Sequence, residues 1–207
     1  MNGDAVNIEN VVGTGNIEYT EEYRKRFVEQ NEGAKEPVFE IDVEQLADGL
    51  GPETWSNDGP HPGLHMRMDE GNEDAPLTTF YRSGKYIIRA STPERLFEEN
   101  EKVKDELTRI GVLYEDVEVD FKISNIVCVA DMERDINLEA LAIALDLEKV
   151  EYEPEQFPAL IYRDPEQYAC TFLVFANGNV VIPGGTDIDK VRDSFERFSD
   201  TVEEWLI

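Results

Sequence analysis

The residue types that perform covalent chemistry are sparse in this sequence. Its two histidines, His61 and His65, have no further set of metal ligands near them. The two cysteines, Cys128 and Cys170, fall in strand-like segments, and we expect free buried thiols in a reducing cytoplasm, although a disulfide or a metal pair stays open. These residues predict no metal site and no cofactor.

Two strand-like segments carry apolar side chains on both faces. Side chains alternate along a strand, so Asn125 and Val127 share one face while Ile126 lies on the other. Leu173 and Phe175 likewise share a face. The sequence has too few helices to cover both faces, and a large uncovered apolar face is typical of a ligand surface. We therefore expect binding rather than catalysis on this face.

The elements that would position this face occur twice in the chain. Four pairs of segments match: 8–12 with 123–127, 41–50 with 136–145, 62–67 with 158–163, and 83–88 with 177–182. The first pair is 115 residues apart and the second 95, which predicts an insertion of about 20 residues near 15–37. We expect an N-terminal repeat over 1–115 and a C-terminal repeat over 116–207, together forming one domain.

Each repeat reads as a strand, a short helix, several strands and a long helix. Asp42 and Asn137 are suited to cap the two short helices. Thr92 and Pro93 predict the start of the first long helix. The second long helix has an apolar stripe of Ile188, Val191, Phe195, Phe198, Val202 and Leu206.

The insertion has its own helical pattern. Thr20 can cap it, Tyr23 and Phe27 are four residues apart, and Gly33 can end it. The basic run 24–26 inside it is either part of a solvated surface helix or a contact for a partner or for the DNA backbone.

The charge is strongly negative. Acidic residues outnumber basic ones 46 to 19, for a formal net charge of −27. This sign opposes binding to a polyanion unless molar salt, as in a halophilic cytoplasm, shortens the Debye length to ~3 Å. The segments 123–130 and 168–185 contain no acid, which favours a neutral working face. No apolar run approaches membrane-spanning length and no signal peptide is recognisable, so we expect a soluble cytoplasmic protein.

Three motifs together resemble one known family. They are ISNIV at 123–127, EYEPEQFPALIYR at 151–163 and FLVFANGNVV at 172–181. In this order they resemble the C-terminal repeat of the archaeal and eukaryotic TATA-box binding proteins. The resemblance implies an α+β saddle of two pseudo-symmetric repeats, with a curved antiparallel sheet and helices on its convex face. It also implies a transcription initiation factor, not an enzyme, that bends A/T-rich promoter DNA from the minor groove.

The resemblance assigns roles in the C-terminal repeat. Phe157 and Phe175 match the wedge pair that enters between base steps, and Asn125 matches a central asparagine that donates to base acceptors. The remaining matched DNA-contact positions are Val127, Arg163, Leu173, Val181 and Pro183.

The N-terminal repeat matches less well. Its expected DNA contacts are Asn10, Val12, His61, Arg67, Thr79, Tyr81, Lys85, Ile87 and Arg89. His61 and Tyr81 replace the wedge phenylalanines, and histidine costs more to desolvate. Thr79 stands where an apolar residue is usual, and Arg89 and Pro183 replace threonines. We therefore expect weaker kinking at the end of the site that this repeat reads.

The resemblance also implies a protein partner. Glu153 and Glu155 match acidic residues that meet transcription factor B. Two other interpretations stay open: a degenerate paralogue that keeps this partner but binds DNA weakly, and an enzyme such as a glycosylase on a similar fold. A homodimer through the concave face also stays open.

Overall fold

A computed structural model describes residues 6–50, 55–56, 63–69, 72 and 74–203. The chain divides into two compact units. The C-terminal unit consists of Met1–Val11 and Ser124–Ile207, and the N-terminal unit of Val12–Ile123. The first strand of each repeat crosses this division, so the units do not coincide with the repeats of the sequence. The repeat boundaries stay a prediction.

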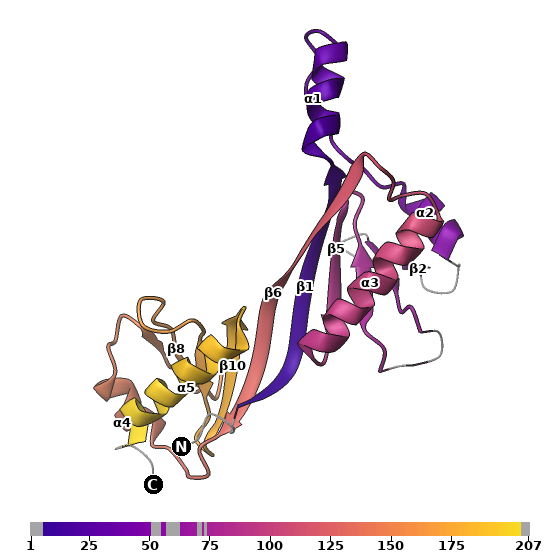
Figure 1. Ribbon diagram of the computed structural model, residues 1–207. Helices are drawn as coiled ribbons and strands as arrows, with labels where there is room; N and C mark the ends of the chain where they lie inside the picture. Colours follow the sequence, from indigo (N-terminus) through magenta and orange to yellow (C-terminus); the bar gives the residue numbers. More distant parts are fainter. Residues whose placement is uncertain (1–5, 51–54, 57–62, 70–71, 73, 204–207) are drawn as a thin grey trace. The chain divides into compact units, whose positions relative to one another are not determined.

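The N-terminal half of the chain carries strand, helix, strands and helix in the predicted order (Figure 1). Its elements are β1 (Asn7–Tyr19), α1 (Glu21–Gln30), α2 (Val43–Leu50), β2 (Trp55–Ser56), β3 (Gly63–Met66), β4 (Leu77–Phe80), β5 (Lys85–Ala90) and α3 (Pro93–Arg109).

The C-terminal half repeats this order without the extra helix. Its elements are β6 (Val117–Asp131), α4 (Leu138–Ala144), β7 (Val150–Glu151), β8 (Leu160–Tyr162), β9 (Phe172–Val174), β10 (Asn179–Gly185) and α5 (Ile188–Val202). The strands form an open sheet in the order β2-β3-β4-β5-β1-β6-β10-β9-β8-β7, and every strand pairing with a determined register is antiparallel. The predicted α+β class is therefore confirmed.

The predicted helix starts are confirmed by their caps. The carboxylate of Asp42 accepts from the backbone N–H groups of Glu44 and Gln45, each at 3.1 Å. Asn137 caps α4 through the N–H of Ala140, and Thr92 caps α3 ahead of Pro93. These side chains satisfy donors that the first turn leaves without an intrahelical partner.

The core of the C-terminal unit lies between α5 and one face of its strands. The predicted stripe on α5 is buried at Val191, Phe195, Phe198 and Val202, whereas Leu206 lies outside the described residues. The ring of Phe198 stacks on that of Phe172 from β9, with centroids 4.1 Å apart and planes 7° from parallel. The helix therefore covers one face of these strands and leaves the other to solvent or a ligand.

The core of the N-terminal unit follows the same plan. Phe80 and Tyr86 are fully buried, and the hydroxyl of Tyr86 donates to Asn100 on α3. Gly15 makes this packing possible, because a Cβ there would lie 2.1 Å from the Tyr86 ring. Helix α3 therefore covers one face of this unit's strands.

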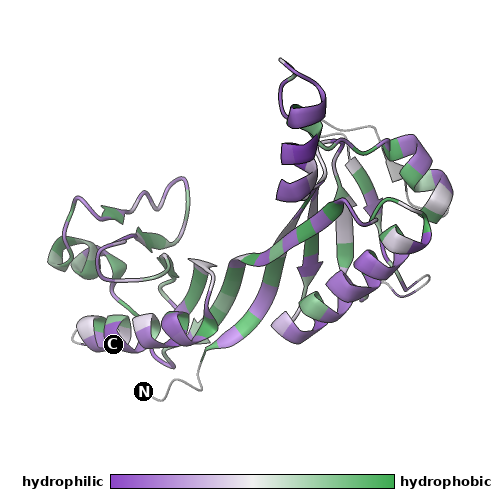
Figure 2. Cartoon of the chain, turned by 45° about the horizontal axis from the view of Figure 1, so that its top comes forward, coloured by the Kyte–Doolittle hydropathy of each residue, from purple (hydrophilic) through white to green (hydrophobic). Residues whose placement is uncertain are grey.

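The predicted insertion helix is present as α1. Thr20 caps it, accepting from the N–H of Tyr23 at 3.2 Å, and Gly33 follows its end with φ +83°. Strand β1 continues to Tyr19, so the added segment begins later than the predicted residue 15. No residue of α1 is buried, and the helix is almost wholly hydrophilic (Figure 2).

Candidate nucleic-acid interface

The strands of the C-terminal unit present an apolar face opposite α5. Register pairs Val129 with Val181, Val181 with Leu173, and Leu173 with Ile161. These four half-buried side chains form a row across β6, β10, β9 and β8. Their neighbours along the strands point to the opposite face, toward α5, and are buried: Cys128, Ile182, Val174 and Leu160. We call this row and the adjoining side chains of Asn125, Val127, Phe175 and Pro183 the C-terminal open face.

Two phenylalanines stand together at one end of this face. The rings of Phe157 and Phe175 are 6.2 Å apart, edge to face with planes 68° apart. Phe157 is 40% exposed, a large fraction for a phenylalanine. Phe175 also lines a hollow of about 360 Å³ with Val129 and Val181. The structure therefore brings together the two aromatic residues that the sequence predicted as a pair.

Backbone hydrogen bonds in tight turns fix the positions of Phe157 and Phe175. The carbonyl of Glu153 accepts from the N–H of Phe157 at 2.9 Å, which closes the turn that follows β7. Phe175 exchanges backbone hydrogen bonds within the hairpin to β10, donating to Asn179 at 2.9 Å and accepting from Gly178 at 3.0 Å. Gly178 has φ +86°, and a Cβ there would lie 2.4 Å from the carbonyl of Arg134. The hairpin tip therefore requires glycine.

Asn125 has its carboxamide fixed by a β-bulge. The pairing of β10 with β6 shifts between Ile182 and Gly185, and Gly184 in the bulge has φ +93°. The N–H of Gly184 donates to Oδ1 of Asn125 at 3.0 Å. This bond identifies Oδ1 as the acceptor and leaves the amide N–H₂ as a donor, with no partner in the described part of the chain. An amide donor of this kind complements the acceptors on the minor-groove edges of A·T pairs.

The corresponding face of the N-terminal unit is more polar. Register pairs Ile87 with Thr79 and Thr79 with His65, in place of valine, leucine and isoleucine. Nδ1 of His65 lies 2.9 Å from Oγ1 of Thr79, and Thr79 is only 1% exposed. The predicted contact of the Thr79 side chain with DNA therefore has no support in this structure, because its hydroxyl is engaged with His65.

The other predicted residues of the N-terminal repeat are accessible. Lys85 and Arg89 are exposed, and Tyr81, Ile87 and Val12 are half-buried. Asn10 is half-buried in the part of β1 that belongs to the C-terminal unit. His61 lies outside the described residues.

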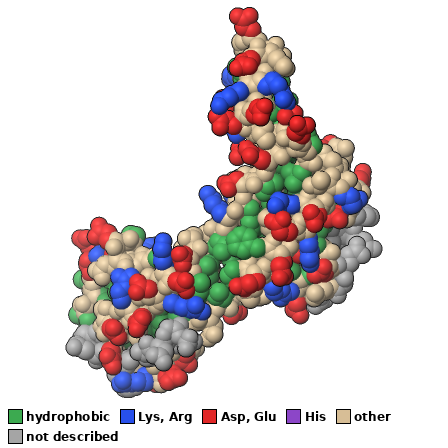
Figure 3. Space-filling model, in the orientation of Figure 1, with side chains coloured by type: hydrophobic (Ala, Val, Ile, Leu, Met, Phe, Trp, Pro, Cys, Tyr) green, Lys and Arg blue, Asp and Glu red, His purple; other side chains and the backbone are tan. Residues whose placement is uncertain are grey.

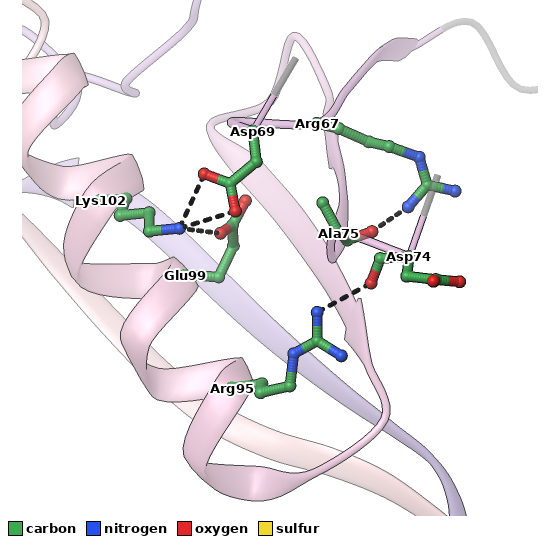
Figure 4. A network of polar contacts seen from close by, with 7 residues as sticks. All are labelled: Arg67, Asp69, Asp74, Ala75, Arg95, Glu99 and Lys102. Carbon is green, nitrogen blue, oxygen red and sulfur yellow. Dashed lines mark hydrogen bonds and ion pairs between the residues drawn. The ribbon is translucent and has the colours of Figure 1, made fainter. Parts of the chain in front are cut away.

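The two predicted phosphate-facing arginines differ in their surroundings. Arg163 is exposed. The guanidinium of Arg67 donates to the carbonyl of Ala75, within a polar network that joins the β3–β4 connection to α3 (Figure 4). This contact uses one guanidinium N–H of Arg67 and holds the side chain toward the β3–β4 connection.

The two cysteines, which the sequence offered as candidates for chemistry, are not part of the C-terminal open face. Cys128 and Cys170 are buried free thiols, and burial raises the pKa of Cys170 to about 11. No three His, Cys, Asp or Glu side chains gather as a metal site among the residues that the structure describes. No helix in the described ranges is both long and apolar enough to span a membrane.

Sequence reasoning missed two residues of the C-terminal open face and the glycine that orients Asn125. Val129 and Ile161 could have been found by continuing the alternation from Val127 and Arg163. Gly184 could not be found in this way, because its role depends on the register between β10 and β6.

Comparisons with known proteins agree with this geometry. The family model for transcription factor TFIID (or TATA-binding protein, TBP) matches residues 120–205. TATA-box-binding protein C of Halobacterium salinarum is 42% identical over 174 residues, covering 83% of this chain and 94% of that protein. TATA-box-binding protein 2 of Haloferax volcanii is 36% identical over 165 residues, covering 79% and 86%.

A solved structure is similar over nearly the whole chain. The TBP of Methanococcus jannaschii has a TM-score of 0.68 and 27% identity, covering 97% of this chain and 98% of that one. The sequence matches therefore extend into both repeats, and the fold matches throughout. The chain belongs to the TATA-binding protein family, as a haloarchaeal type of member.

Proposed function

We propose that this protein is a transcription initiation factor that binds A/T-rich, TATA-like promoter DNA in the minor groove and bends it. One observation carries the proposal: an aromatic pair, the exposed Phe157 and the half-buried Phe175, adjoins an apolar row that crosses four strands. Apolar side chains inserted between base steps unstack and kink a duplex. We place this activity in a prokaryotic cytoplasm, at the nucleoid.

The same turn supports recruitment of transcription factor B. Glu153 and Glu155 are exposed, and the carbonyl of Glu153 is the group that holds Phe157. A basic partner surface at these carboxylates would therefore stiffen the turn that carries a wedge residue. We infer that factor B binding and DNA bending reinforce each other.

The test is binding of a fluorescent TATA-containing duplex to the full chain at molar KCl. Phe157→Ala and Phe175→Ala are expected to reduce both affinity and bending, measured by anisotropy and by energy transfer between the duplex ends. Phe97→Ala is the matched control, because Phe97 is 46% exposed on α3 and lies outside the open faces. Equal losses in all three variants would contradict the proposal.

A degenerate paralogue with weak DNA binding is the second candidate. It is favoured by the polar row of Ile87, Thr79 and His65 and by the contact between Arg67 and Ala75. In this case the duplex would shift in a gel only when factor B is present, and Glu153→Gln would abolish the shift. A homodimer through the open faces would instead show as competition between duplex binding and self-association in sedimentation.

A further inference from the structure

A track of aromatic side chains leads from α1 onto the rest of the N-terminal unit. The ring of Tyr23 lies 6.2 Å from Phe27 and 4.6 Å from Tyr19, and Tyr19 meets Phe39 edge to face at 5.3 Å. All four side chains are only half-buried. We call these four residues the aromatic track. Rings that stay partly exposed on a helix without buried residues leave apolar surface available to a partner.

The track ends in a cavity of about 600 Å³ at the foot of α1. Its walls come from the ends of the insertion, from α2 and from the turn after α3: Tyr19, Phe39, Glu40, Ile41, Asp42, Gln45, Leu46, Asp48, Gly49, Ile110, Gly111, Val112 and Tyr114. Tyr114 is 50% exposed. Figure 3 shows hydrophobic side chains in this area, with Asp and Glu around them. Among the residues that the structure describes, none of those predicted to contact DNA or factor B lines this cavity.

Among the described residues, the cavity lining carries three carboxylates and no lysine or arginine. The exposed side chain of Asp48 has no ion pair or hydrogen bond within the part of the chain that the structure describes. Asp42 uses one oxygen to cap α2. Glu40 meets only Arg82, at 3.4 Å and with both side chains largely exposed, and such pairs are weak.

The basic run of α1 does not neutralise these acids. Arg24 pairs with Glu18, Lys25 with Glu21 and Arg26 with Asp116, and none of those acids lines the cavity. The cavity therefore keeps a negative charge beside exposed aromatic rings.

We propose that this cavity and the aromatic track dock an arginine-bearing amphipathic segment of a partner protein. A guanidinium group stacks on aromatic faces and pairs with carboxylates through two parallel hydrogen bonds, which matches Tyr19, Tyr114 and Asp48. Apolar residues of the same segment would lie along Tyr23 and Phe27. Nucleic acid fits this cavity poorly, because its phosphates would face the three carboxylates of the lining, whereas the side chains of the C-terminal open face include no acid.

The test uses a fluorescein-labelled helical peptide in which Arg and Leu recur at helical spacing, and a matched peptide with citrulline at each Arg position. Anisotropy with the full chain is expected to show at least about tenfold tighter binding of the arginine peptide, since it makes several charge-assisted contacts that the citrulline peptide lacks. Asp48→Asn and Tyr114→Ala are each expected to weaken binding. Glu196→Gln, which removes an exposed acid on α5, is the control with unchanged affinity.

Circular dichroism establishes that each variant is folded. Three results would overturn the proposal: no binding of the arginine peptide, equal binding of the citrulline peptide, or equal losses in Glu196→Gln and Asp48→Asn. The last result would mean that the peptide is attracted by the net charge alone. Concentration-dependent self-association that Asp48→Asn abolishes would also overturn it, by assigning the cavity to a second copy of this chain. Promoter binding is measured in parallel and is expected to be unchanged in Asp48→Asn, which keeps this test separate from the proposed function.

Discussion

The backbone N–H of Gly184 donates to Oδ1 of Asn125 at 3.0 Å, and this bond decides which end of the Asn125 carboxamide meets a ligand. The bulge that contains Gly184 provides the N–H at this position. The donor end of the amide is therefore presented, and the acceptor end is used internally.

The substitution Asn125→Asp keeps the acceptor oxygen of this side chain and removes its N–H₂ donor, so it tests the roles of the two ends separately. Aspartate still accepts from Gly184, so the free energy of unfolding should change little. DNA binding should weaken by about 1–3 kcal/mol, roughly 5-fold to 150-fold, because base acceptors lose their donor and meet a carboxylate. Thermal unfolding and duplex anisotropy at molar KCl measure the two effects. A variant that loses stability but keeps its affinity would show that Asn125 has only a structural role.

Phe198→Ala tests the division between the covered and the open face. Phe198 stacks on Phe172 inside the core, so its loss should cost ~3–5 kcal/mol of stability. Phe157→Ala should cost much less, because Phe157 is already 40% exposed. Denaturant unfolding at constant salt gives both values. Similar costs for the two variants would mean that Phe157 belongs to the core.

Much of this architecture could be predicted from local sequence. The caps Asp42, Thr92 and Asn137 act within a few residues of their own position, so their types alone locate helix starts. Alternation located the buried side of β6 because the strand is long. These features depend on neighbours in sequence, which a single chain displays directly.

The rest depends on pairing between distant segments. Thr79 lies in a strand of four residues, and the contact of its hydroxyl follows from the pairing with His65 on β3. The bulge at Gly184 follows from the register of β10 against β6. The cavity at the foot of α1 follows from where the insertion packs. None of these relationships leaves a local pattern in the sequence.

Glu99→Gln is expected to stabilise the protein at neutral pH. Glu99 is 1% exposed, and neither carboxylate oxygen has a hydrogen-bond partner among the described atoms. Lys102 lies 3.5 Å away and also contacts Asp69 (Figure 4). Burial raises the pKa of Glu99 above 4.5, although Lys102 opposes this shift. The folded state then binds the proton more tightly than the unfolded state, so wild-type stability falls as pH rises through this window.

The stability of the Glu99→Gln variant lacks this dependence on pH, because glutamine does not titrate. Its melting temperature should exceed that of the wild type at neutral pH, and the difference should vanish as the pH falls below the ordinary range of a glutamate. Glu98→Gln is the control, because Glu98 is exposed on the same helix and its loss should not reproduce the effect. A wild type more stable than Glu99→Gln at neutral pH would mean that the ion pair with Lys102 outweighs the burial of charge.

Promoter affinity should respond to salt in the opposite way to that of most DNA-binding proteins. A protein that neutralises phosphates with lysine and arginine releases cations, and its affinity falls with a log–log slope of about −0.9 per phosphate. This chain has a formal charge of −27, and the side chains that make up its C-terminal open face are all uncharged, so none of them can replace those cations. Acids around this face would retain or take up cations when a duplex approaches. Anisotropy titrations from low to molar KCl should therefore give a flat or positive slope, with the protein folded throughout by circular dichroism. A steep negative slope would mean that arginines such as Arg89 and Arg163, rather than the apolar row and the phenylalanine pair, supply most of the binding free energy.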